Sequence, residues 1–490
     1  MSSRGPASVG NAIAKTHLHN MKPSFFSCWR RIALPTMIVA ALAVPAWAAP
    51  KKLLVVTATK GFRHSSIPVA EKVLAMLGAD SQTFTVEYVR GGPDGKDDAE
   101  VRQKMSPENL QNFDGVIFAN TTGDLAIPDK EFFLNWIKSG KAFIGMHSCS
   151  DTYHGYPPFI EMLGGEFLTH HEQVKVSCIN EDPQHPANVH FGENFVLFDE
   201  IYLHKNFKRE NVRGLLSLDK HPNKGFPGDF PISWCKEYGK GRVFYTALGH
   251  REDVWDAEWK DGSGRRANPP EVSKAYQQHI LGGIQWALGL KPGEGKPHNL
   301  AYKVSAEEAA QGFKPLFNGM DLTGWRLRDP NGIKSWSAQN GMLVNTVPEG
   351  GHGTDLVSEE KFKNFTVRYE YMVPKGANSG FYLRGRYEIQ ILDDGDATQP
   401  SNTGNGSFYS LVAPVKMASK KAGEWQTVEA TLIGNKATVI LNGVKIVDNV
   451  ALERTTGGQL DNNVNEPGPF LLQGDHGAVA FRNLRVKVLP

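Results

Sequence analysis

Cysteine is scarce in this sequence, with four among 490 residues: Cys28, Cys149, Cys178 and Cys235. No two of them have the close spacing of a disulfide-rich domain or a zinc ribbon, which excludes a disulfide framework and a paired-cysteine metal site. Cys28 lies in a segment that we expect to be removed. A single disulfide among the other three stays open if the protein reaches an oxidising compartment.

An excess of either charge is also missing. Lys and Arg number 54 and Asp and Glu 52, which gives a formal net charge of +2. Five basic and no acidic residues fall within residues 1–48, so the chain without that segment has a formal charge of −3. A mildly acidic body lacks the basic footprint of nucleic-acid-binding proteins, and we expect no nucleic-acid partner.

The apolar run near the N-terminus, residues 32–44, is too short to span a bilayer, which takes about 20 apolar residues. It follows Lys22 and the pair Arg30-Arg31, and it precedes Ala46-Trp47-Ala48. This order predicts a secretory signal peptide over residues 1–48, with Met21 as an alternative start and cleavage near Ala48. The arginine pair leaves Sec and twin-arginine export open. We expect a periplasmic or secreted protein without a stable membrane span.

The length of the chain exceeds the roughly 250 to 300 residues at which one hydrophobic core stops growing, so more than one domain is expected. Between residues 51 and 290, apolar runs of strand length alternate with segments of helical period. The runs are residues 53–57, 115–119, 141–146 and 241–246. This alternation predicts an α/β domain with a parallel sheet covered on both faces.

The alternation of strand-like and helical segments ends in a predicted linker, residues 291–311, which opens with Lys-Pro-Gly-Glu-Gly-Lys-Pro. From residue 312 to residue 490, short alternating segments are separated by Gly, Asn and Asp. Such segments predict an all-β sandwich or jelly roll. Asn442-Gly443 predicts a tight hairpin, because both turn positions need a positive φ.

Histidines follow several of the predicted parallel strands. His64 comes after the first run, His147 directly after residues 141–146 and His250 after residues 241–246, while His171 lies in an insertion. Ligands of open parallel sheets bind beyond the carboxyl ends of the strands, so we predict that these residues line a sugar-binding or metal-binding crevice. The alternative is that individual histidines only hydrogen-bond the backbone. The spacing specifies no cofactor and leaves a divalent metal open.

The first domain resembles the ThuA-like (trehalose utilisation) family, which has a flavodoxin-like, class I glutamine amidotransferase-like α/β fold. In amidotransferases the turn after the strand presents a cysteine nucleophile, whereas this sequence has His147 there. An imidazole does not replace a thiolate in glutamine hydrolysis, and Cys149 could do so only through a shifted turn. The matching segments are Gly61-Phe62-Arg63-His64, Gly145-Met146-His147-Ser148, residues 163–167 with His170-His171, residues 239–250 and residues 282–287.

The second domain contains a series of ordered motifs: residues 313–325, Asn364-Phe365, Asn378-Ser379-Gly380, residues 387–393, Glu424-Trp425, Leu441-Asn442-Gly443, Leu472-Gln473 and Phe481-Arg482-Asn483. With these motifs the domain resembles the 3-keto-disaccharide hydrolases. That resemblance implies a concanavalin-like jelly roll that acts on glycosides already oxidised at carbon 3.

Strand alternation over residues 386–392 places Arg386, Glu388 and Gln390 on one face and the apolar residues between them in the core. We expect the polar set to face the open side of the sandwich, with Asp393 joining it only through a bulge or at the strand end. The run Glu-x-Gln-x-x-Asp lacks the central acid of the Glu-x-Asp-x-x-Glu strand in jelly-roll glycosidases. That absence argues against a retaining mechanism with two close carboxylates.

A ketone at carbon 3 acidifies the proton at carbon 2, so one base and one enolate stabiliser suffice to expel the glycosidic oxygen by β-elimination. We predict Glu388 as the base, with Arg384, His476 or a bound cation stabilising the oxyanion. A solvated sheet face is the alternative interpretation of this strand. The predicted sugar contacts are Asn378, Gln390, Asp393, Gln473 and an aromatic residue, either Tyr382 or Trp425.

These patterns point to a small carbohydrate as the ligand, and they specify neither the sugar, the linkage nor the oligomeric state. The competing hypothesis is a non-catalytic carbohydrate-binding sandwich attached to a catalytic α/β domain. No Gly-x-Gly-x-x-Gly motif follows a predicted strand, so we expect the oxidation that makes the ketone to occur on another protein.

Overall fold

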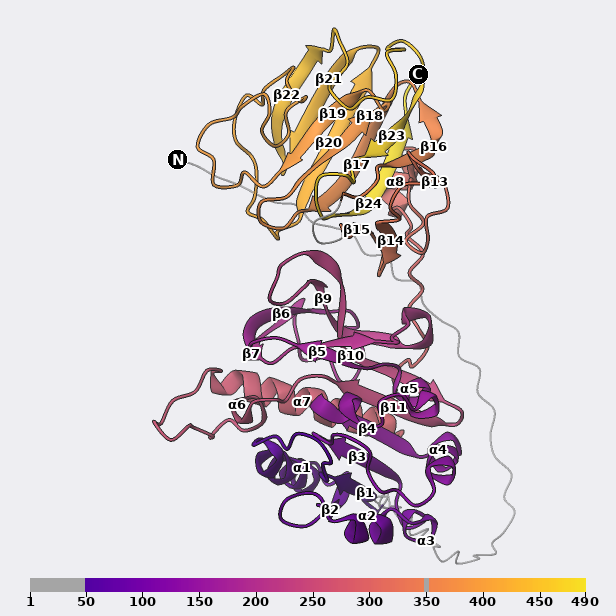
Figure 1. Ribbon diagram of the computed structural model, residues 1–490, viewed down its shortest axis with the longest axis vertical. Coiled ribbons are helices and arrows are strands. Elements are labelled where there is room, and N and C mark those ends of the chain that lie inside the picture. Colours follow the sequence, from indigo (N-terminus) through magenta and orange to yellow (C-terminus); the bar gives the residue numbers. More distant parts are fainter. Residues whose placement is uncertain (1–48, 348–351) are drawn as a thin grey trace, which may run out of the picture. The chain divides into compact units, whose positions relative to one another are not determined.

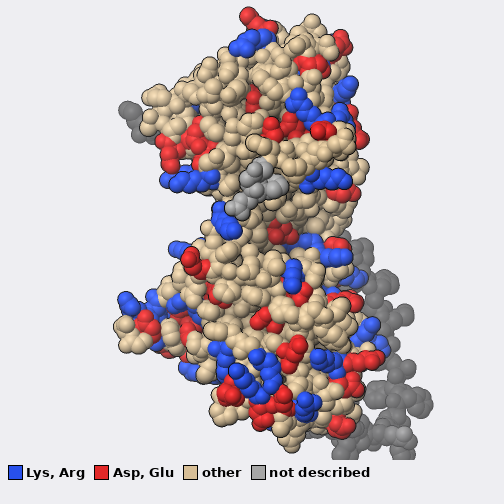
Figure 2. All heavy atoms as spheres, viewed as in Figure 1, with Lys and Arg blue, Asp and Glu red and all other residues tan. Residues whose placement is uncertain are grey.

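The computed structural model describes residues 49–347 and 352–490. The predicted signal peptide, residues 1–48, lies outside these described residues. Two sheet-based domains follow one another along the chain, the first between Lys51 and Ala287 and the second between Phe313 and Val488 (Figure 1). On the face drawn in Figure 2, Lys and Arg are interspersed with Asp and Glu. No helix in the described ranges is long and apolar enough to cross a membrane.

The first domain contains a nine-stranded sheet, and five neighbouring strands of it are parallel. In spatial order they are β2 (Phe84–Val89), β1 (Lys51–Val56), β3 (Gly115–Ala119), β4 (Ala142–Met146) and β11 (Gly241–Thr246). Four of these are the apolar runs that the sequence marks as strands. The predicted α/β domain with parallel strands is confirmed for this half of the sheet.

The other half of the sheet is antiparallel, and the sequence analysis missed it. It continues from β11 through β10 (Pro227–Tyr238), β9 (Arg213–Lys220), β6 (Val174–Asn180) and β7 (Asn194–Asp199). The pairing of β10 with β9 shifts register at Pro227, Pro231 and Ser233. Prolines and bulges of this kind mask a strand pattern in a sequence.

Helices cover both faces of the parallel half. Leu53 and Val55 share one core with helices α1 (Ile67–Ser81) and α7 (Pro270–Ala287). The alternate residues Leu54 and Val56 share the other core with α4 (Lys130–Lys138) and α5 (Pro157–Leu163). Strands buried on both faces read as continuous apolar runs, which is why the sequence identified them. The smaller elements of this domain are α2 (Asp98–Lys104), α3 (Pro107–Leu110), α6 (Glu252–Trp255), η1 (His147–Asp151), η2 (Arg209–Asn211), β5 (Glu166–His170) and β8 (Tyr202–Lys205).

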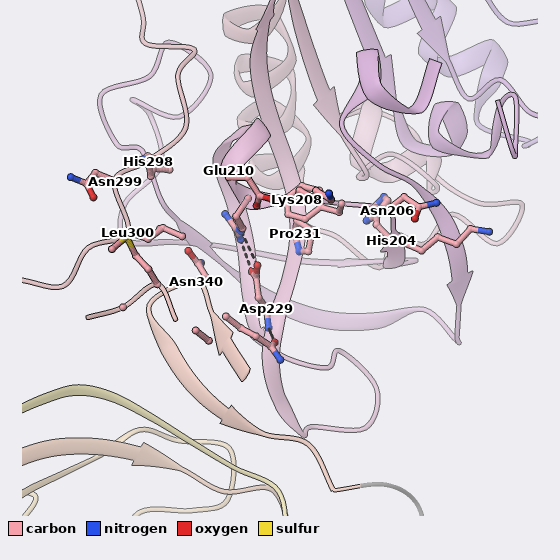
Figure 3. Close-up of a pocket in the computed structure, with 17 residues that line it drawn as sticks. His204, Asn206, Lys208, Glu210, Asp229, Pro231, His298, Asn299, Leu300 and Asn340 are labelled. Carbon is pink, nitrogen blue, oxygen red and sulfur yellow. Dashed lines mark hydrogen bonds and ion pairs between the residues drawn. The ribbon is translucent and has the colours of Figure 1, made fainter. Parts of the chain in front are cut away.

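A buried ion cluster joins η2 to the antiparallel strands. The guanidinium of Arg209 donates from Nη1 to Glu181 Oε2 at 2.6 Å and from Nε to Asp229 Oδ2 at 2.7 Å. Figure 3 labels Asp229 and marks its hydrogen bonds with dashed lines. All three side chains are 11% exposed. Arg209 therefore neutralises two carboxylates that would otherwise be buried together.

We expect Arg209→Met to lower the free energy of unfolding of the first domain by about 3 to 5 kcal/mol near neutral pH, because it leaves two uncompensated buried carboxylates. Urea unfolding followed by tryptophan fluorescence measures this loss. Arg265→Met is the matched control, since Arg265 is 78% exposed and its pair with Asp261 contributes little. Equal midpoints for the two variants would contradict this role of Arg209.

The second domain is a β-sandwich, as predicted, and the strand pairs described in it are antiparallel. One sheet has the order β14 (Trp336–Gln339), β15 (Met342–Asn345), β24 (Val479–Val488), β17 (Phe365–Met372), β20 (Gln426–Ile433), β21 (Lys436–Leu441) and β22 (Val444–Ala451), with β12 (Phe313–Pro315) paired to β24. The other sheet has the order β13 (Trp325–Leu327), β16 (Leu356–Phe362), β23 (Gly468–Leu472), β18 (Asn378–Leu383) and β19 (Tyr387–Leu392).

Apolar side chains from both sheets meet in one core, which includes Val367, Phe381 and Phe481. Asn442 and Gly443 connect β21 to β22 with φ angles of 51° and 78°, the tight hairpin that the sequence predicted. The predicted linker contains one short helix, α8 (Ala306–Ala310).

Candidate functional site

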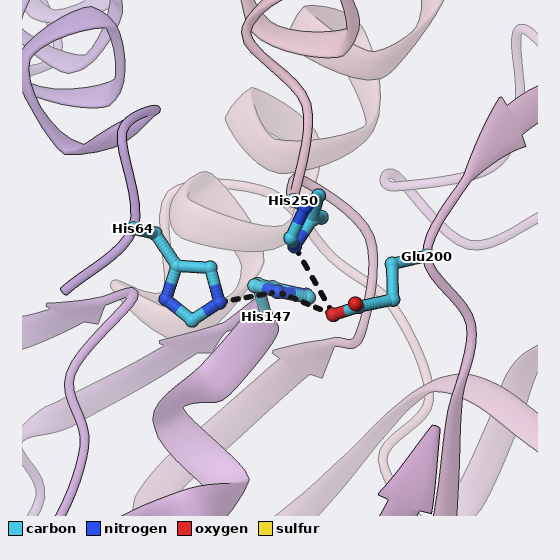
Figure 4. Close-up of side chains that lie close together, drawn as sticks. All are labelled: His64, His147, Glu200 and His250. Atoms are coloured by element: carbon cyan, nitrogen blue, oxygen red, sulfur yellow. Dashed lines mark hydrogen bonds and ion pairs between the residues drawn. The ribbon is translucent and has the colours of Figure 1, made fainter. Parts of the chain in front are cut away.

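The first candidate site lies where loops of the first domain converge (Figure 4). His64 follows β1, His147 follows β4 directly, His250 follows β11 and Glu200 follows β7. The four side chains each offer one nitrogen or carboxylate oxygen, and these atoms all lie within 4.8 Å of one another. The parallel strands β1, β4 and β11 bring their histidines to the carboxyl edge of the sheet, where ligands of open sheets bind.

The separations within this cluster are short. His147 Nε2 lies 3.2 Å from His64 Nε2 and 3.8 Å from Glu200 Oε1. Glu200 Oε1 is also 3.1 Å from His250 Nδ1, and its other oxygen is 2.9 Å from His170 Nδ1. His147 and His250 therefore both lie near Oε1 of Glu200, and His64 lies near His147.

His147 occupies a constrained position at the end of β4. Its φ is +46°, in the left-handed region that a side chain with a Cβ rarely adopts. The ring is fully buried, and Nδ1–H donates to the carbonyl of Ala247 at 2.8 Å. Burial, reinforced by the neighbouring His64 and His250, lowers the pKa of His147 well below its usual range. The ring is therefore neutral with its Nε2 lone pair directed into the cluster.

The other two histidines differ in their charge preference. Burial lowers the pKa of His64 to about 4, and His250 contributes to this shift. Burial also acts against protonation of His250, but the carboxylate of Glu200 outweighs it and raises the pKa of His250. The cluster therefore brings His64 and His147, which favour the neutral form, close to His250, which favours the protonated form.

A buried polar network fixes the loops that carry these residues. Asp199 accepts hydrogen bonds from the backbone N–H of Gly249 at 2.8 Å and of Arg251 at 3.2 Å. Asn120 donates to Ser66 Oγ and to the carbonyl of Gly249. Gly249 has a φ of +110°, and a Cβ there would lie 2.7 Å from the hydroxyl of Tyr276. Only glycine fits this junction between the loops after β1 and β11.

The second candidate site lies on one face of the five-stranded sheet of the sandwich. The alternation predicted for β19 is confirmed: Tyr387, Ile389 and Ile391 lie in the sandwich core, while Glu388 and its polar neighbours point to the opposite face. The expectation that this face is open is wrong, because Arg386, Glu388 and Gln390 are 2%, 4% and 3% exposed.

Two distant segments cover this face and explain its burial. Strand β19 is an edge strand, and its outer backbone groups bond to Gly406, Ser407 and Tyr409 on one segment and to Thr456 on the other. Leu460 packs beside Tyr382 on the same face. Burial therefore comes from chain more than 15 residues away in sequence, which strand alternation cannot reveal.

Glu388 has mixed surroundings. It lies opposite Tyr382 in the β18–β19 pairing, and it packs over Gly380, where an added Cβ would lie 2.4 Å from Glu388 Oε1. Burial raises the pKa of Glu388 to about 7, with Asp355 adding to the shift and His476 opposing it. A carboxyl group with this pKa suits general-base catalysis near neutral pH.

The remaining predicted sugar contacts have different environments. Trp425 packs against Met342, Val344 and Ala480 of the other sheet and so does not join Glu388. Asn378 Oδ1 and Gln473 Oε1 are buried without a hydrogen-bond partner, so each has an acceptor free for a ligand. The hydroxyl of Tyr382 donates to the carbonyl of Gly457 at 3.0 Å. Asp393 instead accepts from the N–H of Gly376, and Gln390 donates weakly to the carbonyl of Thr403.

Backbone carbonyls bind the guanidinium of Arg384. It occupies the turn between β18 and β19 with a φ of +55°. Its guanidinium donates to the carbonyl of Lys363 and, at 3.1 Å, to the carbonyl of Val464. Because backbone carbonyls engage these donors, His476 and a bound cation are the remaining candidates for the predicted oxyanion role, and His476 is half exposed and pairs with Asp475.

Family comparisons match both domains. Residues 52–267 match the family model described as trehalose utilisation (ThuA), and residues 312–487 match the model described as a 3-keto-α-glucoside-1,2-lyase-like domain. The chain joins a ThuA domain to a 3-keto-disaccharide hydrolase domain.

Individual relatives agree with this division. A 3-keto-disaccharide hydrolase of Bacteroides thetaiotaomicron is 29% identical over 233 residues, which cover 37% of this chain and 79% of that protein. A candidate glycosyl hydrolase of Parabacteroides distasonis is 22% identical, with a TM-score of 0.33 and coverage of 38% of this chain and 99% of that one. A candidate ThuA-like protein of Parabacteroides merdae is 18% identical, with a TM-score of 0.38 and coverage of 49% and 90%. At such scores, the fold rests on the strand orders above.

Three of the four histidines predicted to share a crevice, His64, His147 and His250, lie together in the cluster. The fourth, His171, does not join them: its ring lies 5.2 Å from that of His221, while its neighbour His170 contacts Glu200. Glu200 was missed because it follows the antiparallel strand β7, which was not predicted from the sequence. The Cys149 alternative fails, because Sγ is buried in the core against Gly145 and burial raises the pKa of the thiol.

Proposed function

We propose that this protein is an exported, periplasmic or secreted carbohydrate-processing enzyme. Its 3-keto-disaccharide hydrolase domain, a jelly roll of the concanavalin type, would cleave glycosides oxidised at carbon 3. The observation that carries the proposal is the buried carboxyl of Glu388, whose pKa is raised to about 7. Asn378 at the start of β18 and Gln473 directly after β23 add unpaired acceptor oxygens in the same sheet. The family description and the name of the Bacteroides thetaiotaomicron relative support the substrate class.

The proposed reaction is an elimination followed by hydration. Glu388 removes the proton at carbon 2, the electron pair forms the enolate of the carbon 3 ketone, and the bond from carbon 1 to the glycosidic oxygen breaks. The proton held by Glu388 passes to the leaving oxygen. Water then adds across the resulting double bond, its hydroxyl bonding to carbon 1 and its proton to carbon 2. His476 is the candidate donor to the enolate oxygen, because it is the histidine whose charge interaction lowers the pKa of Glu388.

The pH dependence of this reaction follows from Glu388. Since the pKa of the carboxyl is raised to about 7, the base is protonated and inactive below that pH and ionised above it. We expect kcat/KM for a 3-keto-glucoside to rise tenfold per pH unit on the acid side and to level off above about pH 7. Initial rates across a pH series measure the profile. A plateau extending down to about pH 5 would contradict Glu388 as the base.

The second candidate function is a non-catalytic carbohydrate-binding sandwich attached to a catalytic ThuA domain. The cluster of His64, His147, His250 and Glu200 favours it, because that cluster offers more catalytic groups than a binding domain needs. Full-length Glu388→Gln and His147→Ala variants separate the two hypotheses on oxidised and unoxidised disaccharides, with products identified by mass spectrometry. Loss of cleavage in Glu388→Gln alone supports the first, and loss in His147→Ala alone supports the second.

A further inference from the structure

We propose that His64, His147, His250 and Glu200 of the ThuA domain bind one divalent transition-metal ion. This proposal does not rest on the chemistry of the sandwich. The four residues come from four separate loops, and their donor atoms nevertheless converge within 4.8 Å (Figure 4). Convergence of this kind requires the folded sheet, since the sequence spacing carries no metal signature.

The separations match those of ligands around one ion. A tetrahedral ion with bonds of about 2.1 Å holds its donor atoms about 3.4 Å apart. Three of the six separations lie on either side of this value, at 3.2 Å for His64 to His147, 3.8 Å for His147 to Glu200 and 3.1 Å for His250 to Glu200. The other pairs lie within 4.8 Å, so their side chains must move closer together to bind one ion.

The hydrogen bonds around the cluster also leave the right atoms free. His147 uses Nδ1–H on the carbonyl of Ala247, which leaves Nε2 for a metal, and His64 has Ser148 Oγ near its Nδ1 at 3.3 Å. His250 Nδ1 is buried and lies 3.1 Å from Glu200 Oε1, its neighbour within the cluster. Metal-binding histidines characteristically anchor one ring nitrogen in this way while the other binds the ion.

The donor set selects the class of metal. Three imidazoles and one carboxylate suit zinc, iron(II), cobalt, nickel or manganese, whereas calcium and magnesium prefer oxygen ligands throughout. Carboxylates that bind a metal are usually hydrogen-bonded to a second group. Glu200 has such a group, because its Oε2 contacts His170.

The approach to the cluster has features of a ligand site. His147 is fully buried at its base, while His170 is 44% exposed and Phe62 is 68% exposed. The ring of Phe62 lies 4.8 Å from that of His64. A bound ion would therefore have a route to an oxygen ligand such as water or a sugar hydroxyl, beside an exposed aromatic ring on which a sugar can stack.

The test is metal binding by the full-length chain. The protein is stripped with chelator, dialysed against Zn²⁺, Mn²⁺, Ni²⁺ or Co²⁺, and its metal content measured by mass spectrometry, with the visible absorption of bound Co²⁺ as a second measurement. We expect one ion per chain. Glu200→Gln keeps the shape of the side chain and should weaken binding by more than about 100-fold, since even outer partners of metal ligands contribute about 10- to 100-fold.

His171→Ala is the matched control for metal content, because His171 is near the cluster in sequence but lies beside His221 instead. It should retain one ion per chain, and circular dichroism should show both variants folded. A wild-type chain that binds none of these ions above the buffer blank overturns the proposal. Equal binding by wild type and Glu200→Gln also overturns it, because the ion would then lie elsewhere.

Discussion

Glu388→Gln is expected to lower kcat/KM for a 3-keto-glucoside by about 10³-fold, within the range of about 10²- to 10⁴-fold that a positioned general base contributes. Glutamine has the shape of the carboxyl but cannot accept the proton from carbon 2. The side chain is only 4% exposed, so water cannot easily replace it. Steady-state kinetics on the full-length chain measure the loss.

The same substitution should stabilise the protein, which separates lost catalysis from lost folding. The pKa of Glu388 is raised from 4.5 in the unfolded chain to about 7 in the fold. The folded state therefore holds a proton that the unfolded state releases between these values, and stability falls as the pH rises through that window. Near pH 8 the ionised group costs at most about 3 kcal/mol, and the variant is free of that cost.

Glu360→Gln is the control for both measurements. Its side chain is 53% exposed and pairs with Lys314, so kinetics and thermal midpoint should stay near those of wild type. A Glu388→Gln variant with wild-type kcat/KM would contradict the assignment of the base. Equal thermal midpoints for wild type and Glu388→Gln near pH 8 would contradict the buried, ionised carboxylate.

Gly380→Ala is expected to lower kcat/KM by about 10²-fold, because a misplacement of about 1 Å in a catalytic group has an effect of that size. The new Cβ would lie 2.4 Å from Glu388 Oε1 and 3.0 Å from its Cγ. The carboxyl must therefore move, while the backbone of β18 tolerates alanine. The expected signature is a fall in kcat with little change in thermal midpoint.

Gly457→Ala is the matched control, since a Cβ at that position meets nothing within 4 Å. It lies in the segment that covers the same face, so a general effect of glycine replacement would appear there too. Similar kinetics for Gly380→Ala and wild type would show that the position of Glu388 over Gly380 is unimportant for turnover.

The strands that could be predicted from the sequence are those whose burial is uniform along their length. Strands β1, β3, β4 and β11 are buried on both faces and read as apolar runs. The antiparallel strand β10 contains Pro227 and Pro231 at register shifts, and Asp229 and Phe230 between them are only partly buried. Its pairing partners are set by tertiary structure, which local pattern does not report.

The same distinction applies to the candidate sites. His64, His147 and His250 could be grouped because parallel strands end at a common edge. Glu200 joins them from an antiparallel strand, so only the fold brings it there. On β19, strand alternation predicted the correct face for Glu388. The residues that bury this face, around Thr456 and Leu460, come from a segment that is remote in the sequence. The raised pKa of Glu388 is a property of that cover, and the sequence could not supply it.

The proposed function depends on removal of the proton at carbon 2 by Glu388 before the glycosidic bond breaks. Cleavage of a 3-keto-disaccharide in D₂O, with the early product examined by NMR and mass spectrometry, tests this step. Product incubated with Glu388→Gln corrects for spontaneous exchange. The mechanism predicts one solvent deuterium at carbon 2 of the released keto sugar, whereas a product that retains its original hydrogen at carbon 2 would contradict it.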